Sequence, residues 1–468
     1  MRDFIMPAAD WDENNPDKKA IRVLINKHAA ERARMEKLLR YYKGEHDILH
    51  DEGRENKLVC NHAKDISDTA SSYFIGEPIS YSSDEDLTDL TDVLDDAEAD
   101  EADGDNGLDL SICGTAYEYV YTKKDETSLM CKNLDADNTF MVYDDTIEKN
   151  ELFAVYYFAK VDDTGRRPVE YRATILTQNL KWELDIVDDN REQMLTEQPE
   201  PHFKGEVPVI KYMNNKLGLG DFELQIPLID AYNALMSDRI TDKEQFIDSI
   251  LAIYGTLLSD EDYDDDEDEN GSDDAMKRLK RRKLLELPDS TRAEYLTRTF
   301  DESGVEILKK AIEQDIHKFS HIPCMTDEAF GGNVSGVAME FKLLGLENIT
   351  KIKTRYYKKG LRKRMRLFKN FYSIKGINLN VDNVKMSFTR ALPKNLLEIS
   401  QIVANLWGKV SKKTLLAQVP FVTDVDAELE AVQAEAEEAA KQQQEIFGGF
   451  QNTPPQDPEK EEPEEQEE

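Results

Sequence analysis

The stretch Ala329–Phe341, with the sequence AFGGNVSGVAMEF, decides how the second half of this chain is expected to fold. Three glycines and two short polar residues stand immediately before the longest helical pattern: Gly331, Gly332, Asn333, Ser335 and Gly336. Because glycine tolerates backbone angles that other residues avoid, this composition predicts a mobile, tightly turning loop. A functional loop and an ordinary helix-to-helix turn both remain open on the residues alone.

A long helix is predicted after the loop, because residues 335–372 contain no proline. Its second half, Lys351–Lys369, contains ten Lys or Arg residues and no acid, and is called the basic run below. Either of two roles fits the basic run: contact with DNA, or pairing with acidic surface of its own or a neighbouring subunit. The acidity of the remaining chain favours pairing. The candidate contact residues are Lys351, Lys353, Arg355, Arg362, Arg364 and Arg366.

Two amphipathic helices are predicted before the loop, over 223–255 and 301–322, with a small module of about 256–300 between them. Thr241–Glu244 fits a capping box, so the first helix could be interrupted there. The second helix ends before Pro323. Its predicted apolar stripe is Val305, Leu308, Ile312, Ile316 and Phe319.

The module between these helices carries opposite charges close together. Ser259–Asn270 has nine acidic residues in twelve. A basic stretch follows, with six cations in seven positions: Lys277, Arg278, Lys280, Arg281, Arg282 and Lys283. This stretch could meet DNA, bind an acidic partner, or balance the acidic loop. Asp264–Asp266 resembles a metal-binding cluster of a nuclease, but consecutive carboxylates in such a loop lack a fixed scaffold.

The first 220 residues or so predict an α+β body. Helical patterns cover 17–42 and 61–74, and the acidic stretch Asp84–Asp105 is interpreted as a poorly covered helix with a solvated face. Short runs rich in Tyr, Val and Phe then predict an antiparallel sheet, with strands over 115–121, 139–143, 153–161, 169–176 and 181–186.

Composition limits the function of the chain. A formal net charge of −37 over 468 residues argues against a free-standing cationic nucleic-acid binder. No phosphate-binding GxxxxGK[ST] motif and no His/Cys metal pattern occur, so neither enzyme activity, metal nor cofactor is expected. The four cysteines suit reduced thiols in a cytoplasmic product. No apolar run of about 18 residues occurs, so no membrane span is expected.

The order of these segments resembles the portal proteins, or head-to-tail connectors, of tailed double-stranded DNA phages. The resemblance covers about residues 20–420 and is closest to the siphophage type with short chains. The segments that carry it are Pro227–Asn233 with Ser237 and Asp238, the helix–module–helix order, Ile322–Ala338, and the basic helix. Phe330–Ala338 is its most specific part.

The resemblance implies a non-enzymatic ring, a dodecamer, at one vertex of the capsid, through which DNA is packaged and ejected. Terminase large subunit, head-completion adaptor, major capsid and scaffolding proteins, and double-stranded DNA are the implied partners. The location would be the virion, after assembly in the host cytoplasm. The implied parts are a wing (1–222 and 337–394, including a kinked helix), a stem (223–255 and 301–322), a clip (256–300), a tunnel loop (323–336), a crown (395–445) and a disordered acidic tail (446–468).

The implied tunnel loop would face DNA with Asp327, Glu328, Gly331, Gly332, Asn333, Ser335 and Gly336. From Met325 to Ser335 it contains no cation, and each cation would add phosphate affinity to be broken at every step of DNA movement. The sequence therefore predicts a lining that does not hold DNA. Two alternatives remain: an acidic capsid assembly or scaffold component without a channel, and a metal-dependent nuclease.

Overall fold

A computed structural model gives the fold, which divides into two compact units. The first unit comprises Met1–Gly331 and Phe341–Ala391, and the second Gly332–Glu340 and Leu392–Glu468. Helices and sheets are mixed, consistent with the predicted α+β class. The structure describes residues 4–123, 128–160, 170–187, 191–194, 198–247, 250–254, 292–296, 302–325, 336–390, 396–416, 419, 422, 425, 428–429 and 431–436.

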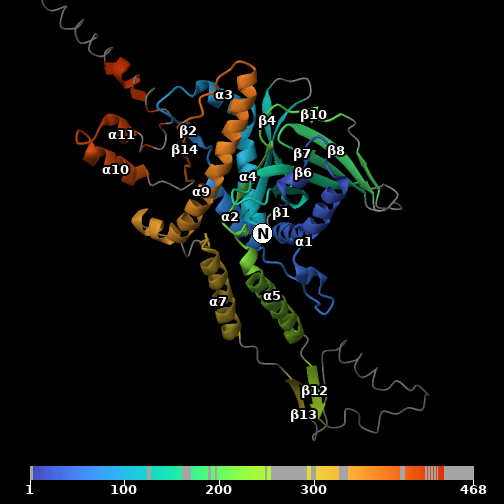
Figure 1. The fold of residues 1–468 in the computed structure, drawn as a ribbon. Helices are drawn as coiled ribbons and strands as arrows, with labels where there is room; N and C mark the ends of the chain where they lie inside the picture. The colour runs from blue at the N-terminus through green and yellow to red at the C-terminus, as the bar shows by residue number, and fades with distance from the viewer. Residues whose placement is uncertain are drawn as a thin grey trace, which may run out of the picture. The chain divides into compact units, whose positions relative to one another are not determined.

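The strands expected between 114 and 209 belong to two sheets, of which the larger has seven strands (Figure 1). The order is β1-β5-β6-β7-β8-β10, and β9 pairs with β8. All neighbours are antiparallel except β1 and β5, which are parallel. Sequence analysis did not predict β1, because a two-residue strand has no periodicity. The bounds are β1 Phe4–Ile5, β5 Thr139–Tyr143, β6 Glu151–Lys160, β7 Glu170–Leu176, β8 Leu180–Val187, β9 Arg191–Met194 and β10 Glu200–Pro201.

Helix α1, Lys18–Lys43, packs against the larger sheet through apolar residues at helical spacing. Asp17 caps it by accepting a hydrogen bond from the backbone N–H of Lys19, and Gly44 ends it in the left-handed conformation. The core that α1 shares with strands β5 to β8 consists of Ile21, Leu24, Ile25, Phe140, Val142, Phe153, Val155, Tyr157, Ala173, Ile175, Trp182, Leu184 and Ile186.

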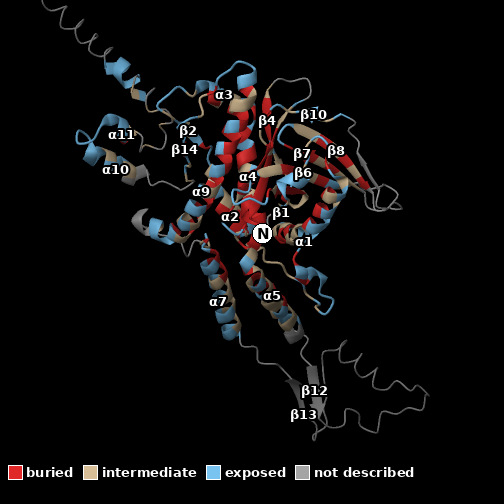
Figure 2. Ribbon diagram, in the orientation of Figure 1, coloured by how far each residue is buried: buried red, intermediate tan, exposed pale blue. Residues whose placement is uncertain are grey.

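The smaller sheet has the antiparallel order β11-β3-β4 and belongs to a second core. Helix α9, Gly336–Ile374, closes this core with Tyr357, Leu361, Met365 and Phe368, and Figure 2 shows the buried surface of α9 and α4 in red. The other elements are α2 His62–Ile75, α3 Thr88–Asp96, α4 Ala99–Cys113, β3 Thr115–Thr122, β4 Leu129–Leu134 and β11 Val209–Met213, with an antiparallel pair β2 Ser80–Ser82 and β14 Lys385–Ser387.

Gly360 lies in the middle of α9 because a ring approaches its backbone. A Cβ atom at this position would lie 2.3 Å from Cε1 of Tyr212. The Tyr212 ring is fully buried and stacks on Tyr357, with ring centroids 4.3 Å apart. Close packing therefore accounts for this glycine within a continuous helix.

Helices α5, Ile226–Ile247, and α7, Glu302–Ser320, lie side by side (Figure 1). They are antiparallel, because Arg239 late in α5 contacts Glu306 early in α7 at 2.9 Å. An antiparallel strand pair lies between them in the sequence, β12 Ile250–Tyr254 and β13 Arg292–Leu296. We call α5 and α7 the helix pair.

Helix α5 is shorter than the helix predicted over 223–255, because the chain is already in strand β12 at Ile250. It is not interrupted at the Thr241 capping-box pattern. Instead, the Thr241 hydroxyl donates to the carbonyl of Ser237 at 3.1 Å, so the side chain satisfies an acceptor within the helix.

The predicted apolar stripe of α7 is wrong in part. Ile316 is buried, but Leu308 and Phe319 are about half exposed, at 49% and 56%. The buried positions near the end of α7 are Ile316, His317 and Ser320, so the packed face is rotated toward polar residues. At this end of α7 the ring of His317 packs edge-on against His62 and lies 3.1 Å from the carbonyl of Ile322. Ile307, Leu308 and Phe319 of α7 remain exposed.

In the second unit, the described helices are short. They are α10 Leu396–Leu406 and α11 Lys412–Leu416, and Leu415 is buried. The acidic tail predicted from 446 onward lies outside the described residues.

Candidate functional site

One side of the basic run on α9 faces the protein interior, where Arg364 forms ion pairs with two carboxylates. Arg364 is 1% exposed and contacts Asp103 at 2.5 and 3.0 Å and Glu118 at 2.5 and 2.8 Å. Tyr357 donates to Asp103 and Tyr212 to Glu118. Burial raises the pKa of Asp103, whereas Arg364 favours its ionised form. The cluster has no positive charge left for an outside partner.

Lys353 is also used inside the protomer. Its Nζ atom lies 2.7 Å from Oδ2 of Asp221, and the lysine is 2% exposed. Asp221 also accepts hydrogen bonds from Ser111 and Asn214 at 2.7 and 2.8 Å. For Lys353 and Arg364 the structure has pairing within the protomer, one of the options that the sequence favoured, and not a DNA or intersubunit contact, because both cations are buried with their counter-charges.

Two further candidates of the basic run pair at the surface of the protomer. Arg366 binds Glu206 through two hydrogen bonds of 2.8 and 3.0 Å. Lys351 lies 3.5 Å from Glu347 one helical turn away. These pairs are exposed and therefore weak, so they leave the two cations accessible to a stronger partner.

Arg355 and Arg362 differ from the other candidates. Both are exposed, and no ion pair joins either of them to another residue in the described part of the chain. Lys359, which lies between them on the same helix, has the same properties. Unlike Lys351 and Arg366, these three cations can make an external contact without breaking an ion pair within the described residues.

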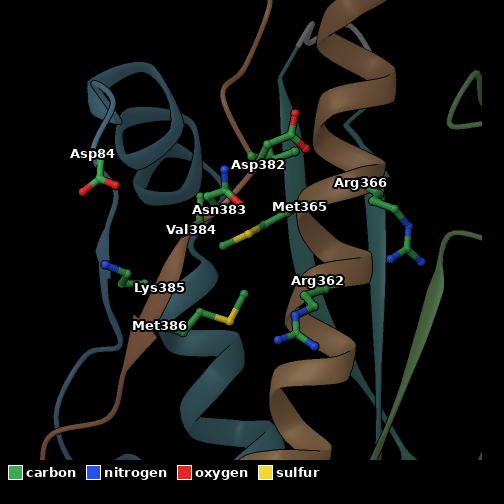
Figure 3. A pocket seen from close by; sticks show the side chains of 10 residues that line it. Asp84, Arg362, Met365, Arg366, Asp382, Asn383, Val384, Lys385 and Met386 are labelled. Atoms are coloured by element: carbon green, nitrogen blue, oxygen red, sulfur yellow. The ribbon is translucent and has the colours of Figure 1, made fainter.

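A groove with a cavity volume of about 610 Å³ lies beside this part of α9 (Figure 3). Its walls combine apolar and charged side chains from α9, the segment before β14, β14 itself and the segment after β2: Asp84, Arg362, Met365, Arg366, Val381, Asp382, Asn383, Val384, Lys385 and Met386. Figure 3 shows Arg362 and Arg366 on α9, and Asp84 and Lys385 across from it. The mixture of signs fits no single small anion or cation.

Buried polar residues fix the helix pair to the body. Asn233 of α5 accepts a hydrogen bond from the backbone N–H of Cys60 and lies 2.8 Å from Nδ1 of His46. Ser237 accepts from the backbone N–H of Leu58 at 2.9 Å. Because both side chains are fully buried, the base of α5 has a defined position against the segment before α2.

Several sequence-predicted site residues lie outside the described residues. These are Asp327, Glu328, Gly331, Gly332, Asn333 and Ser335 of the loop, and Lys277, Arg278, Lys280, Arg281, Arg282 and Lys283 of the module. The same holds for Asp264–Asp266, the suggested nuclease cluster. Gly336 is the first residue of α9. Among the described residues, no group of three His, Cys, Asp or Glu side chains is placed to hold a metal ion.

Comparison with known proteins decides the family. The sequence profile of the family described as "Phage portal protein, SPP1 Gp6-like" matches residues 21–442. The chain belongs to this family of phage portal proteins. The portal protein of Bacillus phage SPP1 is 24% identical, over 92% of this chain and 88% of its own. The portal protein of Clostridium phage phiCD119 is 22% identical, over 87% and 93% respectively.

A solved structure is also similar to this portal-family chain. It is titled "Neck of native GTA particle computed with C12 symmetry", with 10% identity, a TM-score of 0.44, and coverage of 76% of this chain and 89% of that one. None of the described helices of this chain is both long and apolar enough to span a membrane.

Proposed function

We propose that this chain forms a ring with a central channel at one vertex of a phage capsid, through which DNA is packaged and ejected. The observation that carries the proposal is the portal-family match over residues 21–442. The helix pair supports it, because two antiparallel helices with a small module between them suit a ring in which many helix pairs line a hole. Under this proposal the wing, tunnel loop and crown keep the bounds predicted from the sequence, whereas the first stem helix ends with α5 at Ile247 and the clip begins with β12 at Ile250.

The exposed apolar surface of α7 gives a further reason to expect assembly. Ile307, Leu308 and Phe319 are 70%, 49% and 56% exposed. Exposed neighbouring apolar side chains such as Ile307 and Leu308 suit a contact with another protein. In a ring, the neighbouring copy of the helix pair would cover them.

The channel would be non-enzymatic. A separate terminase would supply the energy of packaging, and the insertion between α5 and α7 would provide the surface to which terminase and later a head-completion adaptor dock. Contacts with major capsid and scaffolding proteins would place the ring at the vertex. The number of subunits that we expect is twelve, as the resemblance to phage portals implies.

The test is an image of the purified full chain by negative-stain electron microscopy, with the mass measured by analytical ultracentrifugation. We expect rings with an axial hole and a mass that is a multiple of 53.7 kDa. A monomer, or a solid particle without a hole, at all concentrations and salt levels would overturn the proposal and favour a scaffold role.

The loop from Met325 to Ser335 would line the narrowest part of the channel. Because the segment has no Lys or Arg, we expect it to let phosphates pass without holding them. Replacing Asp327 and Glu328 with lysine should slow packaging in an in vitro assay while leaving rings intact. A double variant that packages DNA at the normal rate would contradict this role for the loop.

A further inference from the structure

The outward face of α9 carries three cations in a row. Arg355, Lys359 and Arg362 are spaced by four and three residues, so they share one face of the helix. The opposite face contains the buried residues Lys353, Tyr357, Leu361 and Arg364. We call Arg355, Lys359 and Arg362 the basic stripe.

The three cations of the basic stripe form no ion pair among the described residues, which sets them apart from most of the basic run. Most other cations of the basic run are paired within the protomer, among them Lys363 with Glu151 and Lys369 with Asp382, and Lys358 lies over the ring of Phe388. By contrast, no ion pair involving the basic stripe occurs within the described ranges. In a chain of net charge −37, three adjacent cations without partners indicate a surface that a negative partner covers.

The same protein provides an acidic surface of matching dimensions on α3. Asp89, Asp92 and Asp96 are exposed and spaced by three and four residues, so they too share one helix face, called the acidic stripe. No ion pair involves them in the part of the chain that the structure describes. No Lys or Arg occurs from residue 65 to residue 122, so cations close in sequence cannot neutralise them.

We propose that the basic stripe of one copy binds the acidic stripe of the next copy. Both stripes span seven helical steps, about 10 Å, so three charges can meet three charges when the two helices lie alongside each other. Because every copy offers one stripe of each kind, the contact is heterologous, and repetition of such a contact closes a ring. The inference rests on the proposed ring function and names the surfaces that set the register between neighbours.

Carboxylates around the basic stripe favour this partner over a DNA backbone. Glu206 lies against Arg366 one turn beyond Arg362, and Asp84 and Asp382 line the groove beside Arg362. The continuous row of phosphates in a DNA backbone would come close to these acids and be repelled by them. Three aspartates on one helix face can contact the basic stripe without approaching these acids. The stripe therefore fits a short acidic helix face.

Charge reversal tests the pairing. The triple variant R355E/K359E/R362E and the triple variant D89K/D92K/D96K should each fail to form rings, because each would place like charges opposite each other. Mixing the two variants should restore rings in which they alternate, since each reversed stripe then meets its complement. Ring formation is measured by sedimentation and negative-stain images, and alternation by mass spectrometry of the intact assembly.

A control variant separates this effect from net charge. Lys19, Lys27 and Lys216 are exposed and lie outside the stripe, so K19E/K27E/K216E changes the net charge by the same amount and should still form rings. The neutral variant R355Q/K359Q/R362Q should raise the concentration for half-assembly by about tenfold, an effect that added salt reduces. Its folding is checked by thermal unfolding.

The possible failures are distinguishable. Wild-type protein that never forms rings would overturn the proposed function. Wild-type rings together with normal rings of the two reversed variants would overturn only the stripe pairing. If R355E/K359E/R362E kept its rings but lost binding to a short DNA duplex that wild type binds, the partner of the basic stripe would be DNA, and the pairing would again be overturned.

Discussion

The guanidinium of Arg364 on α9 contacts the carboxylate of Asp103 on α4 at 2.5 and 3.0 Å, in a site where both side chains are at most 3% exposed. These residues are 261 positions apart in the sequence. The contact therefore fixes the long helix α9 to α4 in the N-terminal half of the chain. Which side of α9 faces outward, and thus where the basic stripe lies, depends on this attachment.

Arg364→Met should strongly destabilise the protein. The substitution leaves Asp103 and Glu118 buried without their cation, and breaking a buried pair in this way costs about 3–5 kcal/mol. Chemical denaturation followed by circular dichroism measures the loss of unfolding free energy.

The matched control is Arg366→Met on the same helix. Arg366 and Glu206 form an exposed pair, so this change should cost about 1 kcal/mol or less. Equal losses in the two variants would mean that the Arg364 cluster contributes no more than a surface pair.

Asn233→Leu should loosen the attachment of the helix pair to the body. The substitution removes the acceptor for the backbone N–H of Cys60 and the contact with His46, and an unsatisfied buried donor costs about 1–3 kcal/mol. Hydrogen exchange should then be faster in α5 and in the segment before α2. Asn26→Leu, at an exposed position of α1, is the control and should leave exchange in α5 unchanged.

The fold was largely predictable wherever the pattern was local. The strands expected over 139–143 and 169–176 are confirmed as β5 and β7, because alternation and flanking turn residues mark a strand directly. The long helix predicted over the proline-free residues 335–372 is confirmed as α9, Gly336–Ile374. What local patterns did not show was how the strands divide into two sheets, which depends on pairings between distant segments such as β3 with β11.

The buried charges were not predictable in the same way. The acidic stretch before residue 105 was interpreted as a solvated face, yet Asp103 is buried and binds a cation far along the chain. One signal was available: Ala99, Asp103, Asn106 and Leu110 share the helical spacing of the buried face of α4. A polar residue within such a spacing indicates a buried partner of opposite charge, but only the fold shows which one.

His28 should make the protein less stable as the pH falls below neutral. Burial lowers the pKa of His28 to about 4, from an ordinary value of about 6.5. Between these values the unfolded chain binds a proton that the folded chain does not. The contribution of His28 to the unfolding free energy is therefore full above about pH 6.5 and decreases toward pH 4, by at most about 1.4 kcal/mol per pH unit.

The measurement compares wild type with His28→Phe in denaturant at pH 5 and pH 7. Phenylalanine keeps the ring packing against Phe4 and Phe140, so the difference in stability between the two pH values should shrink. Asp109 changes the stability with pH in the opposite direction, because burial raises its pKa to about 7. This contribution is the same in wild type and in the His28→Phe variant. An unchanged difference between pH 5 and pH 7 would exclude His28 as its source.

Two glycine-to-alanine substitutions should have opposite effects on stability. Gly360→Ala places a methyl group against the Tyr212 ring, which cannot move aside because it stacks on Tyr357 and donates to Glu118. We expect a loss of about 1–3 kcal/mol. Gly104→Ala meets no atom within 4 Å in the middle of α4, so the higher helix propensity of alanine should stabilise the protein by about 0.5–1 kcal/mol. Both values come from the same denaturation experiment, and a Gly360→Ala variant as stable as wild type would show that α9 does not pack as closely against β11 as the structure has it.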